Sequence, residues 1–374
     1  MKHLKLKPRE ERRLLRGHPW AYRNEFEQIP PLQESDVVDI YTAHGRFVAR
    51  GFYQAQGGIA VRVLSRHQAP VDRALWEARV GDAGAFRERL WPGQDVYRWV
   101  FGESDGMPGF VADRYGPVVV CETSCPFYGA HAAVLAESFM KAEGVAGVKM
   151  TVAGEETLYG EVPPDVTCRV EGVTVSVGLE GGQKTGLFLD QRLNSLAARR
   201  YCSGARVFDG HCYVGMWSCH AALAGASSVL GVDTSGPAVE RAAVNARLNG
   251  VDSVCSFERA DVMEALQRGE RYDVAILDPP AFAKGRAQLK KALSLYQALN
   301  RTALDALAPG GILITSTCSH FVGRDAFLEV LKRAVTSAQR QGWVLSASGA
   351  APDHPVLMSM PETEYLTCVT LRAD

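Results

Sequence analysis

Hydrophobic and polar positions divide the chain into stretches with different periodicities. Short β-type runs come first, at 37–41, 46–53 and 59–65, and glycine and polar residues separate them. A helical pattern follows near 71–90. From about residue 185, strand-like and helix-like runs alternate to the end of the chain. Strands that alternate with helices of this length predict βαβ units and a mostly parallel sheet.

These patterns predict three domains. We expect a small β-barrel over residues 1–70, a middle α/β domain over 71–180 and a doubly wound α/β domain over 181–374. The middle domain contains an amphipathic stretch near 128–143. It ends in a two-strand pattern for which Glu171-Gly172 is the expected hairpin turn.

The last domain is predicted in more detail. Its strands are expected at 205–210, 227–233, 254–260, 272–278, 310–317, 343–349 and 365–371. Its helices are expected at 217–225, 235–249, 288–308 and 322–341. The last two strands have no helix between them, so we expect them to form an antiparallel hairpin at the sheet edge.

Charge is distributed unevenly, although the whole chain carries a formal net charge of −1. Residues 1–73 hold 13 Lys or Arg and 8 Asp or Glu, a net of +5, and the remainder carries −6. Cationic side chains bind phosphates, and aromatic side chains stack on unpaired bases. We therefore expect an RNA-binding surface that includes Arg12, Arg13, Arg16 and Trp20.

Composition excludes several classes of protein. Hydrophobic residues make up 47% and charged residues 22%, which is typical of a globular protein and not of a disordered or collagen-like chain. The N-terminus has no signal-peptide pattern, and no stretch has the length and apolarity of a membrane span. The nine cysteines show neither zinc-site nor CxxC spacing, so we expect free thiols in a reducing cytoplasm and no metal.

Acidic residues follow three successive predicted strands of the last domain. In parallel sheets the carboxyl ends of the strands share one edge, where doubly wound folds bind nucleotides. Asp233 lies 24 residues after Asp209, close to the spacing at which an acid meets ribose hydroxyls. Ser235 also has the position of a helix cap. The cofactor residues predicted here are Asp209, Cys212, Tyr213, Gly215, Asp233, Ser235 and Asp261.

The loop after the first of these strands disfavours a dinucleotide. It lacks a GxGxxG pattern, and His211, Cys212 and Tyr213 crowd the position of a pyrophosphate turn. A phosphate-free adenosine cofactor fits better, and S-adenosylmethionine is the candidate.

Two further strand ends carry reactive groups. The fourth strand runs into LDPPAFAK, which places Asp278 and Pro279 at the ligand edge and offers Phe282 as a flat face for a base. Cys318 ends the neighbouring strand. A thiolate that adds to carbon 6 of a pyrimidine makes carbon 5 nucleophilic, and Asp278 at ring nitrogen 3 would share a proton. Asp278 and Cys318 are thus the predicted catalytic residues.

The chain resembles the bacterial large-subunit ribosomal RNA cytosine-C5 methyltransferases that carry an N-terminal PUA domain. The resemblance rests on GHPWAYRNE (17–25), FGESDGMPGFVADRYG (101–116), GGQKTGLFLDQR (181–192), VFDGHCYVG (207–215), GVDTS (231–235), LDPPAFAK (277–284), STCS (316–319), DHPV (353–356) and PETEYL (361–366). It implies a PUA-like barrel, a middle α/β domain and a class I methyltransferase domain with a seven-stranded sheet. It also implies that Cys318 is the nucleophile, that large-subunit ribosomal RNA is the partner, and that Lys184, Asp190, Gln191 and Arg192 lie near the cofactor or the active site.

The sequence departs from the family pattern at two places. The family loop DLFCYTGGFS is DGHCYVGMWS here, with Met216 in place of a glycine. Related enzymes often carry a second cysteine where this chain has Ala281. The base that removes the carbon 5 proton is therefore open between His320 and His354, and Lys284 is a further candidate for substrate contact.

Alternatives stay open at this point. The same thiol chemistry serves carbon 5 of uracil, and Asp-Pro-Pro-aromatic loops also occur in enzymes that methylate base amines. An RNA-binding assembly factor is a third hypothesis, from outside the enzymes. The target nucleotide and the oligomeric state, for which we consider a homodimer, are not set by these patterns.

Overall fold

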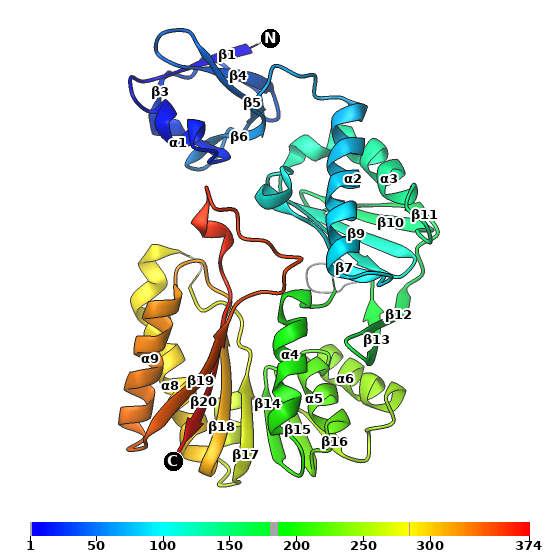
Figure 1. Cartoon of the computed structure of the whole chain (residues 1–374), viewed down its shortest axis with the longest axis vertical. Coiled ribbons are helices and arrows are strands. Elements are labelled where there is room, and N and C mark those ends of the chain that lie inside the picture. Colours follow the sequence, from blue (N-terminus) through cyan, green and yellow to red (C-terminus); the bar gives the residue numbers. More distant parts are fainter. Residues whose placement is uncertain (1, 180–185, 284) are drawn as a thin grey trace. The chain divides into compact units, whose positions relative to one another are not determined.

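The computed structural model describes residues 2–179, 186–283 and 285–374, and the chain forms two compact units (Figure 1). The first unit comprises Met1–Val166, Gly178–Gly186 and Pro352–Thr363. The second unit comprises Thr167–Val177, Leu187–Ala351 and Glu364–Asp374. The domain boundaries expected at residues 70 and 180 stay predictions.

The first unit begins with a six-stranded sheet. Its strands are β1 (Lys2–Leu6), β2 (Trp20–Tyr22), β3 (Phe26–Gln28), β4 (Val37–Tyr41), β5 (Phe47–Tyr53) and β6 (Ile59–Ser65), in the spatial order β2-β6-β5-β4-β1-β3. β1 pairs with β4 in parallel, and the other neighbours are antiparallel. Helix α1 (Glu11–Leu15) adds Leu14 to a core that Leu4 and Leu6 enter from β1. β1, β2 and β3 were not predicted from the sequence, because they are short and lie within the charged N-terminal stretch.

A five-stranded sheet follows in the same unit. Its strands are β7 (Val96–Phe101), β8 (Phe110–Tyr115), β9 (Val118–Thr123), β10 (Gly147–Val152) and β11 (Glu155–Gly160), in the order β11-β10-β9-β8-β7. Helices α2 (Arg73–Leu90) and α3 (Ala132–Met140) pack on the sheet and on each other. Asp72 caps α2 by accepting a hydrogen bond from the backbone N–H of Leu75.

Aromatic side chains join these two sheets into one unit. Phe52 of β5 stacks on Phe127, with ring centroids 4.2 Å apart and planes 2° from parallel. Trp76 of α2 and Tyr128 belong to the same buried cluster. Because aromatic rings bury large areas, a shared aromatic core couples the two sheets strongly.

A hairpin of β12 (Asp165–Val170) and β13 (Val173–Gly178) precedes the large sheet. Its turn residues Glu171 and Gly172 have φ values of 47° and 82°. Positive φ at both central residues is the geometry of a tight two-residue hairpin, which confirms the predicted turn.

The second unit contains a seven-stranded mixed sheet. Its strands are β14 (Arg206–Gly210), β15 (Ser228–Asp233), β16 (Cys255–Arg259), β17 (Tyr272–Leu277), β18 (Leu307–Thr317), β19 (Gly342–Ser348) and β20 (Thr367–Ala373), in the order β16-β15-β14-β17-β18-β20-β19. β20 is antiparallel to both of its neighbours, and the remaining pairs are parallel. The seven predicted strands and the antiparallel last pair are confirmed.

Helices cover both faces of this sheet (Figure 1). They are α4 (Arg192–Ala198), α5 (Met216–Leu223), α6 (Gly236–Leu248), α7 (Val262–Leu266), α8 (Leu289–Ala306) and α9 (Arg324–Ser337). Successive residues of β14 enter different cores, since Phe208 packs with α8 and α9 whereas Val207 packs with α5 and α6. The four predicted helices are present, and the short helices α4 and α7 were missed.

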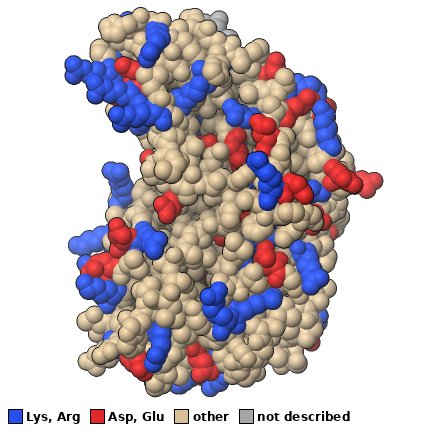
Figure 2. Space-filling view, in the orientation of Figure 1, with Lys and Arg blue, Asp and Glu red and all other residues tan. Residues whose placement is uncertain are grey.

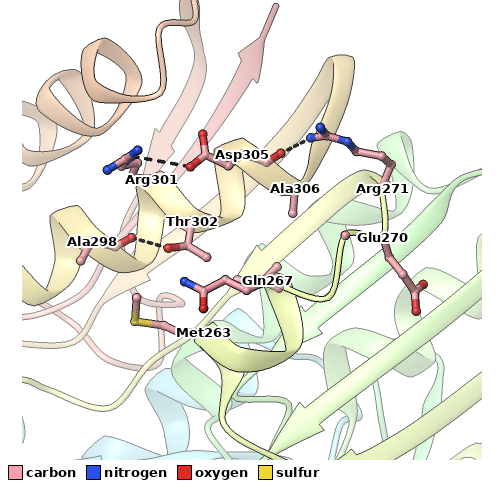
Figure 3. A pocket seen from close by; sticks show the side chains of 11 residues that line it. Met263, Gln267, Glu270, Arg271, Ala298, Arg301, Thr302, Asp305 and Ala306 are labelled. Atoms are coloured by element: carbon pink, nitrogen blue, oxygen red, sulfur yellow. Dashed lines mark hydrogen bonds and ion pairs between the residues drawn. The ribbon is translucent and has the colours of Figure 1, made fainter.

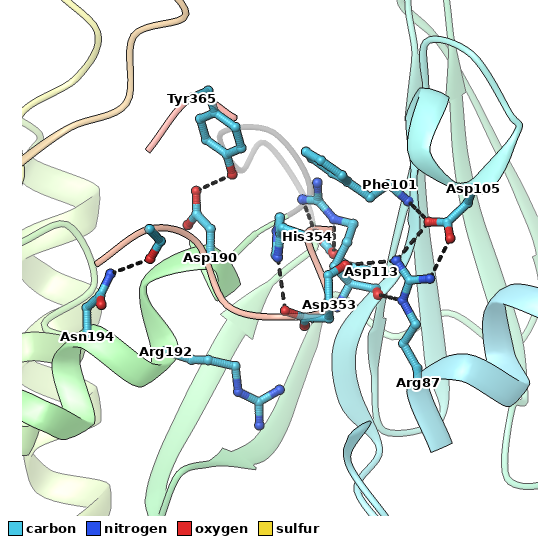
Figure 4. Close-up of polar contacts among 12 residues, drawn as sticks. Arg87, Phe101, Asp105, Asp113, Asp190, Arg192, Asn194, Asp353, His354 and Tyr365 are labelled. Atoms are coloured by element: carbon cyan, nitrogen blue, oxygen red, sulfur yellow. Dashed lines mark hydrogen bonds and ion pairs between the residues drawn. The ribbon is translucent and has the colours of Figure 1, made fainter. Parts of the chain in front are cut away.

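Residues 352–363 connect β19 to β20 and belong to the first unit; we call this segment the strap. The buried Arg87 of α2 donates to both carboxylate oxygens of Asp105, at 2.6 and 2.7 Å, and to the carbonyl of Asp353 in the strap (Figure 4). The backbone N–H of Arg98 donates to the Asp353 carboxylate at 3.0 Å. This ionic network fixes the strap to the five-stranded sheet.

Candidate functional site

The loop between β14 and α5 lies at the carboxyl edge of the large sheet. The backbone N–H groups of His211 and Cys212 both donate to the carbonyl of Val232, at 2.9 and 3.1 Å. His211 and Tyr213 have φ values of 62° and 49°, which non-glycine residues rarely adopt. The hydrogen bonds to β15 therefore hold this loop in a strained conformation, as is common where a backbone approaches a ligand.

Gly215 ends this loop and begins α5. Its φ is 78°, and a Cβ atom here would lie 2.9 Å from the Cβ of Ala242. Glycine is required on both grounds, because the left-handed conformation and the close approach each exclude a side chain. Gly215 thus shapes the predicted cofactor loop through its backbone.

Asp233 is fixed at the end of β15. Its two carboxylate oxygens accept hydrogen bonds from the backbone N–H groups of Tyr213, at 3.0 Å, and Ser235, at 2.9 Å. Each oxygen keeps a further lone pair, and the side chain is half-buried. The carboxylate is thus oriented to accept two more hydroxyl protons, as the prediction for ribose requires.

Two other predicted cofactor residues cap helices. The Ser235 hydroxyl accepts from the backbone N–H of Ala238 at the start of α6. The Asp261 carboxylate accepts from the N–H groups of Met263 and Glu264 at the start of α7, while its side chain stays exposed. Helix capping accounts for both residue types at these positions, so a cofactor role for either stays a prediction.

Asp209 lies deeper than its predicted role as a cofactor ligand requires. The side chain is fully buried, and one carboxylate oxygen accepts a 2.6 Å hydrogen bond from the hydroxyl of Ser218. The other oxygen is buried without a hydrogen-bond partner among the described residues. Burial raises the pKa of Asp209 to about 7, and the nearby Asp278 adds to this rise. The structure therefore supports a positioning role beneath the loop.

The raised pKa of Asp209 makes stability depend on pH. Between pH 3.8 and about 7 the native protein holds a proton that the unfolded chain has released, so the free energy of unfolding falls as pH rises. Asp209→Asn removes this proton. From pH 5 to pH 8, we expect the free energy of unfolding of the parent to fall by about 2–3 kcal/mol more than that of the variant. Urea unfolding at pH 5 and pH 8 measures this difference. Asp252→Asn, at an exposed position, is the control and should behave like the parent. An equal pH dependence of the free energy of unfolding in Asp209→Asn and in the parent would contradict the prediction.

Asp278, directly after β17, is held by two side chains. Gln191 Nε2 donates to one carboxylate oxygen at 2.8 Å, and Trp217 Nε1 donates to the other at 3.2 Å. Gln191 also donates to the Ser316 hydroxyl at 3.0 Å and accepts from Asn194 at 2.6 Å. Asn194, Ser316 and Trp217 were not predicted from the sequence. The three-residue spacing of Gln191 and Asn194 at the start of α4 is a sequence signal that these two side chains can meet.

A recess opens beside this network in the second unit. Its lining includes Phe188, His211, Tyr213, Met216, Trp217 and Asp278. The cavity volume is about 50 Å³, so the recess is narrow. The rings of Phe188 and Tyr213 meet edge-on at 5.1 Å. Burial lowers the pKa of His211, against the opposing effect of Asp233 and Asp261, which favours a neutral ring in this wall.

A larger cavity of about 490 Å³ lies elsewhere in the second unit (Figure 3). It is lined by α7, α8 and the segment that leads into β17 at its amino end, where Arg271 donates to the carbonyl of Asp305. None of the predicted cofactor or catalytic residues lines it. Chemistry, and not size, therefore identifies the narrower recess as the candidate site.

Cys318 directly follows β18 and differs from the other cysteines. All nine are described, eight are buried, and Cys318 is partly exposed. Its sulfur lies 3.7 Å from the carbonyl oxygen of Pro279, next to Asp278 in the chain. Burial raises the pKa of Cys202, Cys219 and Cys255 to about 12, and that of the predicted cofactor residue Cys212 well above its ordinary value. Because a reactive thiol must be accessible, Cys318 is the cysteine suited to nucleophilic attack.

The neighbours of Gln191 serve different contacts. Asp190 is buried; its carboxylate accepts from the Tyr365 hydroxyl at 2.6 Å, and its carbonyl accepts from the N–H of Ala351 at 2.9 Å (Figure 4). Arg192 is also buried and forms an ion pair with Glu171 at 2.7 Å. Asp190 therefore holds together two segments of the second unit, at Ala351 and Tyr365, and the charge of Arg192 is satisfied within the protein.

The candidate substrate residues separate into three groups. Phe282 packs on Tyr296, with centroids 4.5 Å apart, and His320 is exposed beside Tyr365. His354 is buried in the strap of the first unit, where Nδ1 lies 3.0 Å from the Asp353 carboxylate. Burial and this pairing give His354 a structural role in place of the predicted catalytic one. Lys184 and Lys284 lie outside the described residues.

The residues of the basic N-terminal stretch that are predicted to bind RNA differ in exposure and in their contacts. Figure 2 shows Lys and Arg side chains gathered over this part of the first unit. Arg12 and Arg16 are exposed. Arg13 instead forms a 2.6 Å ion pair with Glu25, and Trp20 Nε1 donates to Glu103 at 2.8 Å. Arg13 and Trp20 are partly exposed and make these contacts within the unit, so their contact with RNA stays a prediction.

The described residues were searched for membrane-spanning helices and for metal-binding clusters. Across residues 2–179, 186–283 and 285–374, none of the helices combines the length and the apolar character of a membrane crossing. Within the same residues, no cluster of three or more His, Cys, Asp or Glu side chains is arranged to hold a metal ion.

Comparison with known proteins places these features in context. A PUA-like domain family matches residues 4–66, and the S-adenosylmethionine-dependent methyltransferase family matches residues 153–347.

The chain is 36% identical to a Tolumonas auensis protein named ribosomal RNA large subunit methyltransferase I, over 97% of both sequences. It superposes on a putative SAM-dependent methyltransferase from Streptococcus mutans with a TM-score of 0.88 and 20% identity, covering 100% of both chains. A putative methyltransferase solved in complex with SAH gives 0.89 at 20% identity and the same coverage. The expected fold class, PUA-like domain and cofactor are confirmed.

Proposed function

Because the chain belongs to the ribosomal RNA large subunit methyltransferase I family, we propose that it methylates carbon 5 of a cytosine in the 23S RNA of the large subunit. One observation carries the choice of carbon 5: the single partly exposed cysteine, Cys318, stands beside Asp278-Pro279 at the carboxyl edge of the sheet. Methylation of a base amine needs no nucleophile. Attack by carbon 5 of a pyrimidine does need one.

The residues of the recess, together with Asp233, which is bonded to the lining residue Tyr213, fit S-adenosylmethionine. Asp233 would hold the ribose hydroxyls, because its carboxylate is fixed by two backbone N–H groups and keeps lone pairs for two more donors. The walls formed by Phe188, Tyr213 and Met216 suit an adenosine without phosphates. When bound, the cofactor supplies an electrophilic methyl group on a sulfonium.

The addition step falls to Cys318 and Asp278. The thiolate of Cys318 forms a bond to carbon 6 of the cytosine, and the electron pair of the 5,6 double bond moves through the ring to nitrogen 3. Asp278 shares a proton with nitrogen 3 as negative charge develops there. Gln191 and Trp217 orient Asp278 for this contact through their hydrogen bonds.

The remaining steps restore the ring. Carbon 5 takes the methyl group as the bond from that methyl to the sulfonium sulfur breaks, which would leave a neutral thioether, and the proton on nitrogen 3 returns to Asp278. A base then removes the proton from carbon 5, the 5,6 double bond re-forms, and the bond from carbon 6 to sulfur breaks to regenerate the thiolate. Of the two predicted histidines, His320 remains the candidate base, since it is exposed two residues after Cys318.

The organisation of the chain supports a division of labour. We propose a PUA-like module over residues 1–70 that holds RNA, a middle domain over 71–180 and a catalytic domain over 181–374. The reaction is assigned to the reducing cytoplasm, because the proposed nucleophile must stay a thiol. That assignment and the homodimer stay predictions.

Nucleoside mapping by mass spectrometry tests the proposal. Large-subunit RNA from cells with and without the gene is digested and compared, and the purified protein is then incubated with the RNA from deleted cells. We expect one 5-methylcytosine to disappear with the gene and to return on incubation with S-adenosylmethionine. A lost 5-methyluridine or N-methylated base would replace cytosine carbon 5 as the target, and an unchanged set of nucleosides would contradict the proposed function.

A further inference from the structure

The strap displays an apolar side chain that the protein does not cover. Met358 is 92% exposed, and Val356, two residues before it, is 47% exposed. Burial of a methionine side chain is favourable, so a methionine displayed in this way gains free energy when a partner covers it. Single exposed apolar residues are common on protein surfaces, so the assignment of a partner rests on the surroundings of Met358.

The turn that carries Met358 is held rigidly. Leu357 and Met360 bridge each other across it, and the N–H of Met360 donates to the carbonyl of Leu357 at 2.8 Å. The Thr363 hydroxyl accepts from the N–H of Leu357 and donates to the carbonyl of Met360, both at 2.8 Å. Met360 itself is buried. A projecting apolar side chain on a fixed turn is preorganised to insert into a partner, because little backbone entropy is lost on binding.

The surroundings of the turn point to a polyanion. The Ser359 hydroxyl, next to Met358, donates to the carbonyl of Gly17 at 3.0 Å. Gly17 follows Arg16, and the side chains of Arg12 and Arg16 are exposed. Apart from Glu362, which lies 3.8 Å from His18, the contacts that anchor the strap here are neutral. Met358 thus projects next to the basic stretch that gives residues 1–73 their net charge of +5.

We propose that Met358 is an apolar wedge that inserts between stacked bases of the RNA bound along the basic stretch of the first unit. This inference rests on the proposed function for the identity of the RNA. Carbon 5 and carbon 6 of a stacked base are inaccessible, so an enzyme that acts on them must take the base out of the stack. Proteins that distort nucleic acids insert Leu, Ile, Met or Phe between base steps, next to cations on the phosphates. The polarizable thioether of methionine suits contact with aromatic faces.

The first test identifies the partner without relying on methyl transfer. Met358→p-benzoylphenylalanine in the full chain is irradiated with deproteinised large-subunit RNA and, separately, with whole large subunits. Leu158, which is 53% exposed on β11 of the same unit, is replaced in the same way as control. We expect crosslinks to RNA from position 358 and none from position 158. Crosslinks from position 358 to ribosomal proteins alone, or equal RNA crosslinks from both positions, would overturn the proposal.

The second test separates insertion from simple RNA binding. Methylation is measured on a paired hairpin that carries the mapped cytosine and on an unpaired strand of the same sequence. Met358→Ala is expected to lower the rate on the hairpin about tenfold and to leave the rate on the unpaired strand unchanged. Met358→Leu should retain the rate on both, and Leu158→Ala should change neither.

An equal loss on both RNAs would overturn the wedge. If deletion of the gene removes no 5-methylcytosine, the proposed function fails, and the crosslinks from position 358 still decide the wedge.

Discussion

Cys318→Ala is expected to lower the rate of methyl transfer by about 10³-fold or more while S-adenosylmethionine still binds. The thiolate is proposed to make carbon 5 nucleophilic, and removal of a covalent nucleophile typically costs enzymes at least this factor. Cys318 lies 3.7 Å from the carbonyl of Pro279 and is absent from the lining of the recess, so the cofactor contacts stay intact. Single-turnover methylation and calorimetric titration of the cofactor measure the two quantities separately.

A covalent trap gives an independent readout of the same step. RNA with 5-fluorocytosine at the target position has no carbon 5 proton to lose, so the bond from sulfur to carbon 6 persists after methyl transfer. The parent protein should form an adduct that survives denaturing electrophoresis, and Cys318→Ala should form none. Cys121→Ala is a matched control, because burial raises the pKa of Cys121 well above its ordinary value and the residue lies in the first unit. A Cys318→Ala protein that methylates at the parent rate would refute the mechanism.

Arg87→Met should have the largest effect on stability. Arg87 has no exposed side-chain surface, and it donates to both oxygens of Asp105, to the carbonyl of Arg98 and to the carbonyl of Asp353. Methionine keeps the aliphatic bulk and removes the charge, which leaves the 10% exposed Asp105 carboxylate without its cation. Breaking a buried pair in this way costs about 3–5 kcal/mol. Urea unfolding of the full chain, followed by tryptophan fluorescence, measures the change in the free energy of unfolding.

Two companion variants make the Arg87 result specific. Arg89 lies exposed on the same helix, and Arg89→Met should change the free energy of unfolding by no more than about 0.5 kcal/mol. Adding Asp105→Asn to Arg87→Met removes the uncompensated charge and should recover part of the loss. Equal unfolding midpoints for Arg87→Met and Arg89→Met would show that the ion pair adds no stability.

The sequence predicts the frame of the site better than the roles of its residues. Hydrophobic periodicity located every strand of the large sheet, and the carboxyl ends of those strands then placed Asp233 and Asp278 at one edge. It did not separate Asp209 from Asp233. Both acids lie at the end of a strand, yet Asp209 is buried against Ser218, whereas Asp233 is half-buried and accepts from the backbone of Tyr213. That difference depends on which neighbours pack over each side chain, which is a tertiary property.

Contacts between distant segments account for the other differences. The pairing of Arg192 with Glu171 and of Trp20 with Glu103 joins residues 21 and 83 positions apart. Neither pair leaves a periodic signal, so each side chain looked available for a ligand. The strands β1, β2 and β3 have three to five residues each, too few for alternation to stand out from the charges around them.

The path of the strap constrains the order in which the protein folds during synthesis. β20 lies between β18 and β19 in the sheet, yet it is synthesised after every other strand of that sheet. Residues 352–363 emerge just before it, and their partners Gly17, Arg87 and Arg98 were made hundreds of residues earlier. Because N-terminal parts fold first on the ribosome, the docking surface for the strap is complete when the strap appears. The strap can therefore dock as soon as it emerges, before β20 has been made and can pair with β18 and β19.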